Sequence, residues 1–131
     1  MEKERRPPTA QEMDSYRKRL VEEQERLWSE IRHDLRERLG PEYQDQIATI
    51  RDLEELAQAD LQEDIVIEAV KARKTMLEEI SQALWRMERG EYGKCLDCGR
   101  WICARRLAVE PWASRCLDCQ KKMEREGRGR S

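Results

Sequence analysis

The sequence predicts a mainly α protein in which a long antiparallel helical hairpin, or coiled coil, is joined to a small four-cysteine module and a short C-terminal helix. Three observations predict this class. Two long segments carry apolar residues at helical spacing, and the second has the alternating steps of four and three of a coiled-coil seam. Two C-x2-C pairs follow these segments. The overall composition is too polar for a large core.

Composition and charge limit both the fold and the partners that the sequence allows. Of the 131 residues, 38% are hydrophobic, 41% are charged and none is Phe, which suits a solvated helical hairpin. The net charge of −2 and the pI near 5.7 argue against a general phosphate-binding surface. No signal peptide and no apolar run of membrane-spanning length is visible, so we expect a cytoplasmic protein without a membrane partner.

The first predicted helix opens a hairpin that we place at residues 10–90. Residues 1–9 contain Pro7 and Pro8 and are predicted to be a flexible N-terminus. The helix is predicted from Ala10 to Leu39, with Thr9 as its N-cap. Gly40 and the proline after it end it, because glycine accepts the left-handed conformation and proline cannot continue a helix. The apolar positions that predict this helix are Met13, Tyr16, Leu20, Leu27, Ile31, Leu35 and Leu39.

The second long helix has a clearer seam, from Val66 to Met87. Its one polar position is Arg73, which either fixes the register or extends its charge out of the seam. Two helices of similar length joined by a connecting segment fold back most economically as an antiparallel hairpin. A dimeric coiled coil is the alternative. The seam positions are Val66, Val70, Arg73, Leu77, Ile80, Leu84 and Met87.

The predicted tip of the hairpin, residues 41–64, is strongly acidic. It holds eight acidic residues against the single base Arg51. One interpretation is a solvated turn whose carboxylates favour the start of the second helix through its dipole. The other is an acidic probe directed at a basic channel or a metal centre of a partner. The charge pattern alone favours the solvated turn.

The cysteine pairs Cys95/Cys98 and Cys116/Cys119 are separated by 17 residues. This spacing fits a closed four-thiolate zinc site, since each pair bends around one tetrahedral ion. Two disulfides and a thioredoxin-type redox pair are the alternatives, but a redox pair requires a βαβ context that this chain lacks. We therefore expect one structural Zn²⁺, with Gly99 supplying the positive φ that the first turn needs.

We place the zinc-finger module and the C-terminal helix together at residues 91–126, followed by a flexible tail at 127–131. The C-terminal helix is predicted over residues 120–126. Between the cysteine pairs, Pro111 is expected to prevent any regular element. The fifth cysteine, Cys103, is predicted to be a small buried residue, with a regulatory thiol as the alternative. The apolar floor of the finger is expected to consist of Trp101, Ile102, Leu107, Val109 and Trp112.

One segment resembles a known family closely. It runs Glu88-Arg-Gly-Glu-Tyr-Gly-Lys-Cys-Leu-Asp-Cys-Gly and continues with Ile102, Arg106-Leu107, Pro111 and the second cysteine pair. These residues resemble the zinc finger of the DksA/TraR family, and with the hairpin the resemblance covers roughly residues 13–125. Family members are bacterial proteins that bind RNA polymerase without needing DNA contact. The resemblance implies a coiled coil that enters the secondary channel of the polymerase and acts near its catalytic centre.

The family carries an Asp-x-x-Asp-x-Ala motif at the tip of its hairpin. Counting back from the first cysteine places Asp52, Glu55 and Ala57 at these three positions. Asp52 and Ala57 match the motif, whereas Glu55 keeps the carboxylate but is longer by one methylene. The resemblance therefore implies a role for the acidic tip at the polymerase active site, and it reverses the preference for a merely solvated turn.

A second departure from the family concerns the alarmone ppGpp. Family members that share a ppGpp site with polymerase line it with basic residues, and the aligned positions here are Glu79, Glu110 and Gln120. Two carboxylates repel an anionic nucleotide. We therefore predict that this protein lacks that ppGpp site.

The leading hypothesis is a zinc-containing transcription regulator, expected to be a monomer and not an enzyme. The sequence contains no nucleophile with a base, no phosphate-binding glycine loop and no open metal site. Sequence-specific DNA binding is not expected, because no recognition helix is evident. The alternative function is a zinc-dependent adaptor or thiol redox sensor that does not act on RNA polymerase.

Overall fold

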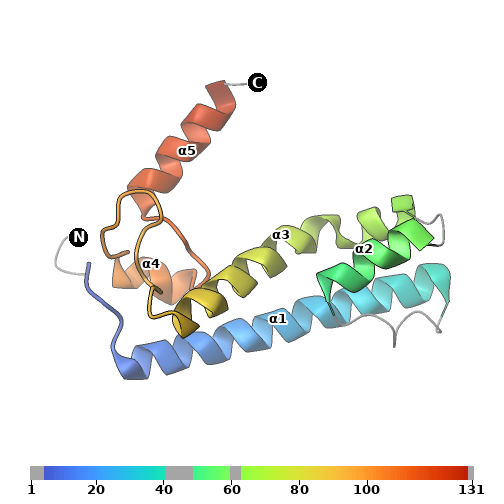
Figure 1. Cartoon of the computed structure of the whole chain (residues 1–131), viewed down its shortest axis with the longest axis horizontal. Coiled ribbons are helices and arrows are strands. Elements are labelled where there is room, and N and C mark those ends of the chain that lie inside the picture. Colours follow the sequence, from blue (N-terminus) through green and yellow to red (C-terminus); the bar gives the residue numbers. More distant parts are fainter. Residues whose placement is uncertain (1–4, 41–48, 60–62, 130–131) are drawn as a thin grey trace. The chain divides into compact units, whose positions relative to one another are not determined.

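The computed structural model describes residues 5–40, 49–59 and 63–129, and five helices lie in this part of the chain (Figure 1). They are α1 (Ala10–Leu39), α2 (Ile50–Ala59), α3 (Glu63–Glu88), α4 (Ala104–Val109) and α5 (Leu117–Gly129). The mainly α class is confirmed. The described residues contain no strand, only two isolated antiparallel bridges. No helix among them is long and apolar enough to cross a membrane.

The chain divides into two compact units. One consists of Met1–Val21 with Glu79–Ser131, and the other of Glu22–Glu78. Both long helices contribute to both units, so the division does not coincide with the helix ends. The predicted domain boundaries at residues 90 and 126 stay predictions.

The start and end of α1 follow the predicted signals. Thr9 Oγ1 accepts a hydrogen bond from the Glu12 backbone N–H at 3.1 Å, and Glu12 Oε1 accepts one from the Thr9 N–H at 3.0 Å. This reciprocal pair is a capping box. Arg6 binds the same carboxylate, and these contacts lower the pKa of Glu12 to about 2, with Arg6 the main cause. At the other end the helix stops at Leu39, where Gly40 has a φ of 117°.

The unit of residues 22–78 is built on the predicted seam. Its α1 and α3 segments run antiparallel, because Arg38 pairs with Glu68 at 3.3 Å while Asp34, one turn earlier on α1, pairs with Arg73, further along α3. Apolar side chains from both helices fill the interface, so the hairpin prediction is confirmed here. The buried apolar residues of this unit are Leu27, Trp28, Ile31, Leu35, Leu53, Val66, Ala69, Val70 and Leu77.

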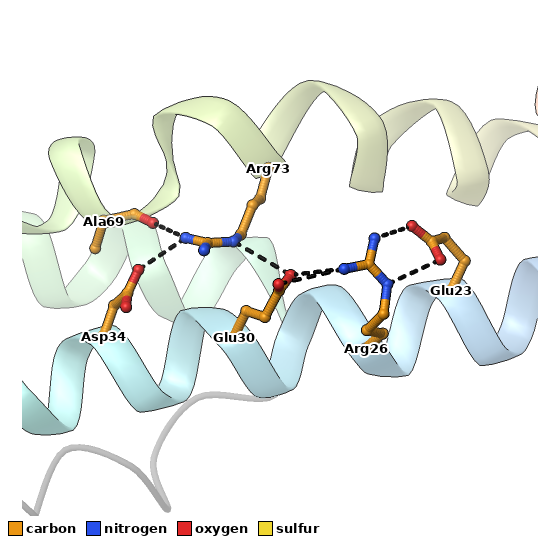
Figure 2. Close-up of polar contacts among 6 residues, drawn as sticks. All are labelled: Glu23, Arg26, Glu30, Asp34, Ala69 and Arg73. Carbon is orange, nitrogen blue, oxygen red and sulfur yellow. Dashed lines mark hydrogen bonds and ion pairs between the residues drawn. The ribbon is translucent and has the colours of Figure 1, made fainter.

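Arg73, the polar seam residue, binds the facing helix instead of extending into solvent, which favours the prediction that it fixes the register. Its Nη1 donates to Asp34 Oδ2 at 2.8 Å and to the Ala69 carbonyl at 3.0 Å, and its Nε lies 3.4 Å from Glu30 Oε2. Glu30 also accepts from Arg26 at 3.2 Å, and Figure 2 shows the ion pairs continuing along α1 to Glu23. The Arg73 guanidinium therefore binds two carboxylates of α1, those of Glu30 and Asp34.

The other unit, Met1–Val21 with Glu79–Ser131, contains the first part of α1, the last turns of α3 and the finger. Tyr16 and Tyr92 lie with ring centroids 6.2 Å apart, and the Tyr92 hydroxyl donates to the Pro111 carbonyl at 2.8 Å. The residues before α1 also contact the finger: Arg5 forms a backbone bridge with Cys103 and an ion pair with Asp118. The buried apolar residues of this unit include Tyr16, Leu20, Ile80, Ala83, Met87, Tyr92, Ile102, Leu107, Pro111 and Ala113.

The Arg73–Asp34 contact is testable by a double-mutant cycle with Arg73→Met and Asp34→Asn. Both side chains are about two-thirds buried or more, so we expect a coupling energy of about 1 kcal/mol that decreases in 1 M salt. The more exposed Arg38–Glu68 pair, which also joins the two helices, is the control, with an expected coupling below about 0.5 kcal/mol. Chemical denaturation measures both cycles, and equal couplings would show that Arg73 has no special role.

Candidate metal centre and hairpin tip

The first cysteine pair lies on a tight turn. The Cys95 N–H donates to the Arg100 carbonyl at 2.8 Å, and the Gly99 N–H donates back to the Cys95 carbonyl at 3.0 Å. Gly99 has a φ of 74°, as predicted, a conformation that residues with a Cβ adopt at a cost. The turn brings Cys98 back over Cys95.

The second pair lies at the start of α5. The Cys116 carbonyl accepts from the Gln120 N–H at 2.9 Å, so Cys116 directly precedes the helix and Cys119 lies in its first turn. The Leu96 N–H donates to the Ser114 carbonyl at 2.9 Å, which ties the first turn to the chain entering the second. The turn of the first pair and the start of α5 thereby bring the two cysteine pairs together.

The four sulfurs lie close enough together to bind one metal ion. All four Sγ atoms lie within 4.8 Å of one another, and the Cys98 and Cys116 sulfurs are 3.9 Å apart. Zinc–thiolate bonds of about 2.3 Å in a tetrahedron separate neighbouring sulfurs by about 3.8 Å, so the spacing fits one zinc ion. Cys95 and Cys116 are buried, Cys119 is half-buried and Cys98 is exposed. Four protein thiolates close the coordination sphere, which leaves no position for a reactive water.

Two of the four cysteines have strongly shifted pKa values. Burial acts to raise the pKa of Cys95, but hydrogen bonds from the backbone of Cys98, Cys116 and Asp97 outweigh it and lower this pKa to about 6. The pKa of Cys119 is raised to about 12, chiefly because of its hydrogen bond with Cys116. The pKa values of Cys95 and Cys119 are therefore shifted in opposite directions. A dication stabilises all four as thiolates.

Two arginines support the second cysteine pair. Arg106 Nε donates to the Arg115 carbonyl at 2.9 Å, directly before Cys116, and Arg115 Nε donates to Asp97 Oδ2 at 2.8 Å. Arg115 thus links the chain before the second pair to the side chain between Cys95 and Cys98. These contacts hold the two pairs in register beside the metal position.

The predicted tip residues lie on α2. Asp52 is the third residue of this helix: its N–H donates to Thr49 Oγ1 at 3.2 Å, and its carboxylate accepts from the Thr49 N–H at 2.9 Å. Glu55 lies one turn further on, is exposed, and pairs with Arg51 at 3.1 Å. Leu53 is 3% exposed and packs inward. Ala57 belongs to the same helix, and residues 41–48 and 60–62 of the predicted tip lie outside the described residues.

The three predicted ppGpp-related positions come together in one cavity. Glu79, Glu110 and Gln120 line a hollow of about 300 Å³ together with Arg106 and Lys121. The pKa of Glu79 is raised, first because of burial and second because of the negative charge of Glu110. Arg106 Nη1 lies 3.6 Å from a Glu110 oxygen, so one of the two bases is already matched by an acid.

Comparison with known proteins identifies the finger. Residues 90–125 match the model of the prokaryotic dksA/traR C4-type zinc finger. This segment is therefore similar to the DksA/TraR C4-type zinc finger. All four cysteines lie within it, so the match agrees with one metal ion per chain.

The resemblance extends beyond the DksA/TraR finger. The structure of transcription factor DksA2 from Pseudomonas aeruginosa is 28% identical, with a TM-score of 0.60 over 88% of this chain and 85% of the other. The RNA polymerase binding protein and transcriptional regulator Dks from Chlamydia trachomatis L2 (LGV434) shares the fold, at 21% identity and a TM-score of 0.52 over 92% and 95%. An uncharacterized protein of Aquifex aeolicus (strain VF5) is 29% identical over 116 residues, which are 87% of this chain and 77% of that protein.

Three expectations about the DksA/TraR finger were wrong. A short helix, α4, does form between the cysteine pairs and ends before Pro111, so the proline limits the helix instead of preventing it. Val109 was expected in the apolar floor but is 71% exposed, because the last residue of α4 faces away from buried Leu107. The C-terminal helix begins at Leu117, three residues earlier than predicted, because Cys116 itself accepts its first hydrogen bond.

Sequence reasoning also missed two supporting residues. Arg86 is 5% exposed, and its Nη2 donates to the Ala113 carbonyl at 3.4 Å, which joins α3 to the finger. Thr49 was overlooked as the partner of Asp52, although the Thr-x-x-Asp spacing at residues 49–52 is a capping-box signal. A buried arginine has no comparable signal in the sequence.

The metal centre is testable by metal analysis of purified protein. We expect one zinc per chain for the wild type and for Cys103→Ser, and well under one for Cys116→Ser, because loss of one thiolate opens the tetrahedron. Chelation should change the fluorescence of Trp101 and Trp112 and melt this unit, since structural zinc sites contribute about 10–16 kcal/mol in model peptides. Full zinc occupancy in Cys116→Ser would contradict the ligand set.

The raised pKa of Glu79 predicts a pH-dependent stability effect. Because the folded-state pKa lies above the ordinary glutamate value of 4.5, ionised Glu79 costs stability at neutral pH, and this cost disappears as the pH falls below 4.5. Glu79→Gln should therefore raise the melting temperature at pH 7.5 and raise it less at pH 5. Glu78→Gln, a change of the same charge at the adjacent and likewise exposed residue, which does not line the cavity, is the control in the same calorimetric measurement. A larger gain at pH 5 would refute the assignment.

Proposed function

We propose that this protein is a regulator of bacterial transcription that binds RNA polymerase through its secondary channel and modulates initiation with its hairpin tip. The observation that carries the proposal is the likeness to transcription factor DksA2, which spans 88% of the chain and so includes both hairpin and finger. We assign Cys95, Cys98, Cys116 and Cys119 as the ligands of one structural zinc ion.

The tip would act through the carboxylates of α2. Asp52 and Glu55 lie three residues apart and so on neighbouring positions of one helix face. Placed near the catalytic centre of polymerase, two negative charges compete for its metal ions and basic side chains and so shift the stability of promoter complexes. The tip thus perturbs the chemistry of its partner and does none itself, consistent with a closed metal site and with a protein that is not an enzyme.

The cavity at Glu79 supports regulation without a DksA-type ppGpp site. An anionic nucleotide entering it would meet Glu79 and Glu110, while Arg106 already faces Glu110. Lys121 is the remaining base that lines the hollow, and Glu124 lines it as well. Like charges at contact distance cost free energy where basic residues would give charge-assisted hydrogen bonds.

The remaining features of the proposal follow from the partner. A protein that acts on RNA polymerase works in the cytoplasm, and its specificity comes from the polymerase instead of from base contacts, so no sequence-specific DNA binding is needed. One hairpin occupies one channel, which requires only a monomer. The alternative function, an adaptor or thiol sensor that does not act on polymerase, would use the finger and Cys103 and leave α2 without a role.

In vitro transcription with bacterial RNA polymerase on a ribosomal promoter tests the proposal. The wild type should change transcript yield, whereas Asp52→Asn and Glu55→Gln should lose most of this effect while still binding polymerase. Asn retains an oxygen that accepts the Thr49 N–H, so Asp52→Asn removes the charge and keeps the helix cap. Glu54→Gln is the matched control, because Glu54 faces the groove between α2 and α3 and pairs with Lys74.

The same assay with and without ppGpp tests the second part of the proposal, that the protein lacks a DksA-type ppGpp site. We expect the nucleotide to leave the action of this protein unchanged. Enhancement by ppGpp that disappears on mutating Glu110 or Gln120 would overturn that part alone. Folded, zinc-loaded protein that neither binds polymerase nor changes transcription would overturn the whole proposal and favour the adaptor or redox function.

A further inference from the structure

The first turn of the short helix α2 is bonded to one exposed residue, Thr49. At ten residues, α2 is shorter than the roughly 12–15 residues that an isolated helix needs to be even marginally stable in water. Of its described side chains, Leu53 is buried, and Glu54 lies 3.9 Å from Lys74 of α3, both of them lining a cavity of about 270 Å³. Because so short a helix has few turns to share the cost of nucleation, closing its first turn contributes a large part of its stability.

Thr49 closes that turn. Its hydroxyl accepts the Asp52 N–H at 3.2 Å, its own N–H donates to the Asp52 carboxylate at 2.9 Å, and its carbonyl accepts the Leu53 N–H at 3.4 Å. Three hydrogen bonds thus connect one residue to the first turn. Two of them end on Asp52, one of the two acids assigned to the tip.

The capping box also sets the direction of the second acid. Successive residues of a helix are rotated by about 100°, so Glu55 lies about 200° from Leu53 around the helix. With Leu53 held inward, Glu55 must point outward, and it is exposed in the structure. If the first turn frays, Asp52 loses its helical position and Leu53 loses the backbone bond that helps to keep it inward.

We propose that Thr49 is a positioning residue of the tip: its capping box with Asp52 holds α2 so that Asp52 and Glu55 present their charges together. This inference rests on the proposed function. It assigns a role to a side chain that carries no charge and that need not touch the partner. It also separates two properties of Asp52, whose negative charge acts on the partner while its oxygen closes the helix.

Thr49→Val tests this, because valine has the shape of threonine without the hydroxyl, and Thr49 is exposed, so no core cavity opens. A lost N-cap typically lowers the ratio of helical to frayed first turn about fivefold. Carbon chemical shifts of residues 50–55 should show this loss in the free protein, and Thr49→Ser should restore the wild-type shifts. Thr9→Val, which removes the equivalent capping bond from α1, is the matched control and should leave the α2 shifts unchanged.

The transcription assay then separates positioning from folding and binding. Thr49→Val should reduce the maximal effect while the concentration giving half of it, which reports polymerase binding, stays at the wild-type value; Thr49→Ser should retain the full effect. An unaltered α2 in Thr49→Val, or a frayed α2 with full activity, would overturn this inference and leave the proposed function intact. A wild type without any effect on transcription would overturn both.

Discussion

Mutual repulsion among four sulfurs is the constraint on which the finger depends. A neutral thiol cluster would gain little by bringing four Sγ atoms within 4.8 Å, and four thiolates would repel one another strongly. Only a bound cation makes this arrangement favourable, and the hydrogen bonds around it are organised to meet that cation. The turn at Gly99, the start of α5 and the Arg106–Arg115–Asp97 contacts each fix one part of the ligand set. The small apolar floor around Ile102 and Leu107 is then sufficient, because zinc binding contributes the ordering free energy that so few buried side chains cannot.

The unit of residues 22–78 is stabilised in a different way. Its interface is a seam of Leu, Ile and Val side chains, which supplies binding energy but leaves the register weakly defined, since similar apolar residues recur at each turn. Arg73 resolves this ambiguity. Its guanidinium reaches both Glu30 and Asp34, which are one turn apart on α1, and a shift by one turn would move one carboxylate out of range (Figure 2). The sequence already marked Arg73 as the one polar position in the seam, and the structure supplies the partners that periodicity could not name.

The success of sequence reasoning followed the strength of local signals. The ends of α1 were predictable to the residue, because a Thr N-cap and a Gly-Pro stop act through the backbone within one turn. The cysteine spacing likewise predicted the metal centre. By contrast, α2 and α4 were not predicted, since helices of ten and six residues show fewer than three turns of periodicity. The clustering of Glu79, Glu110 and Gln120 followed only from the resemblance to a family, and the burial of Arg86 depends on tertiary packing that no local pattern encodes.

The capping box at Thr49 contributes a larger share of the stability of its helix, α2, than the one at Thr9 contributes to α1. At α1, Arg6 also binds the Glu12 carboxylate, and the helix continues for 30 residues with apolar packing in both units, so the cap is one stabilising contact among many. At α2, the same pattern of bonds closes a helix of ten residues whose described buried side chain is Leu53 alone. The longer glutamate at position 55, where the family motif has aspartate, is therefore compatible with the same helix position. Because Thr49 and Leu53 fix the start and rotation of α2, the additional methylene of Glu55 extends its carboxylate outward and leaves the helix beneath it where it was.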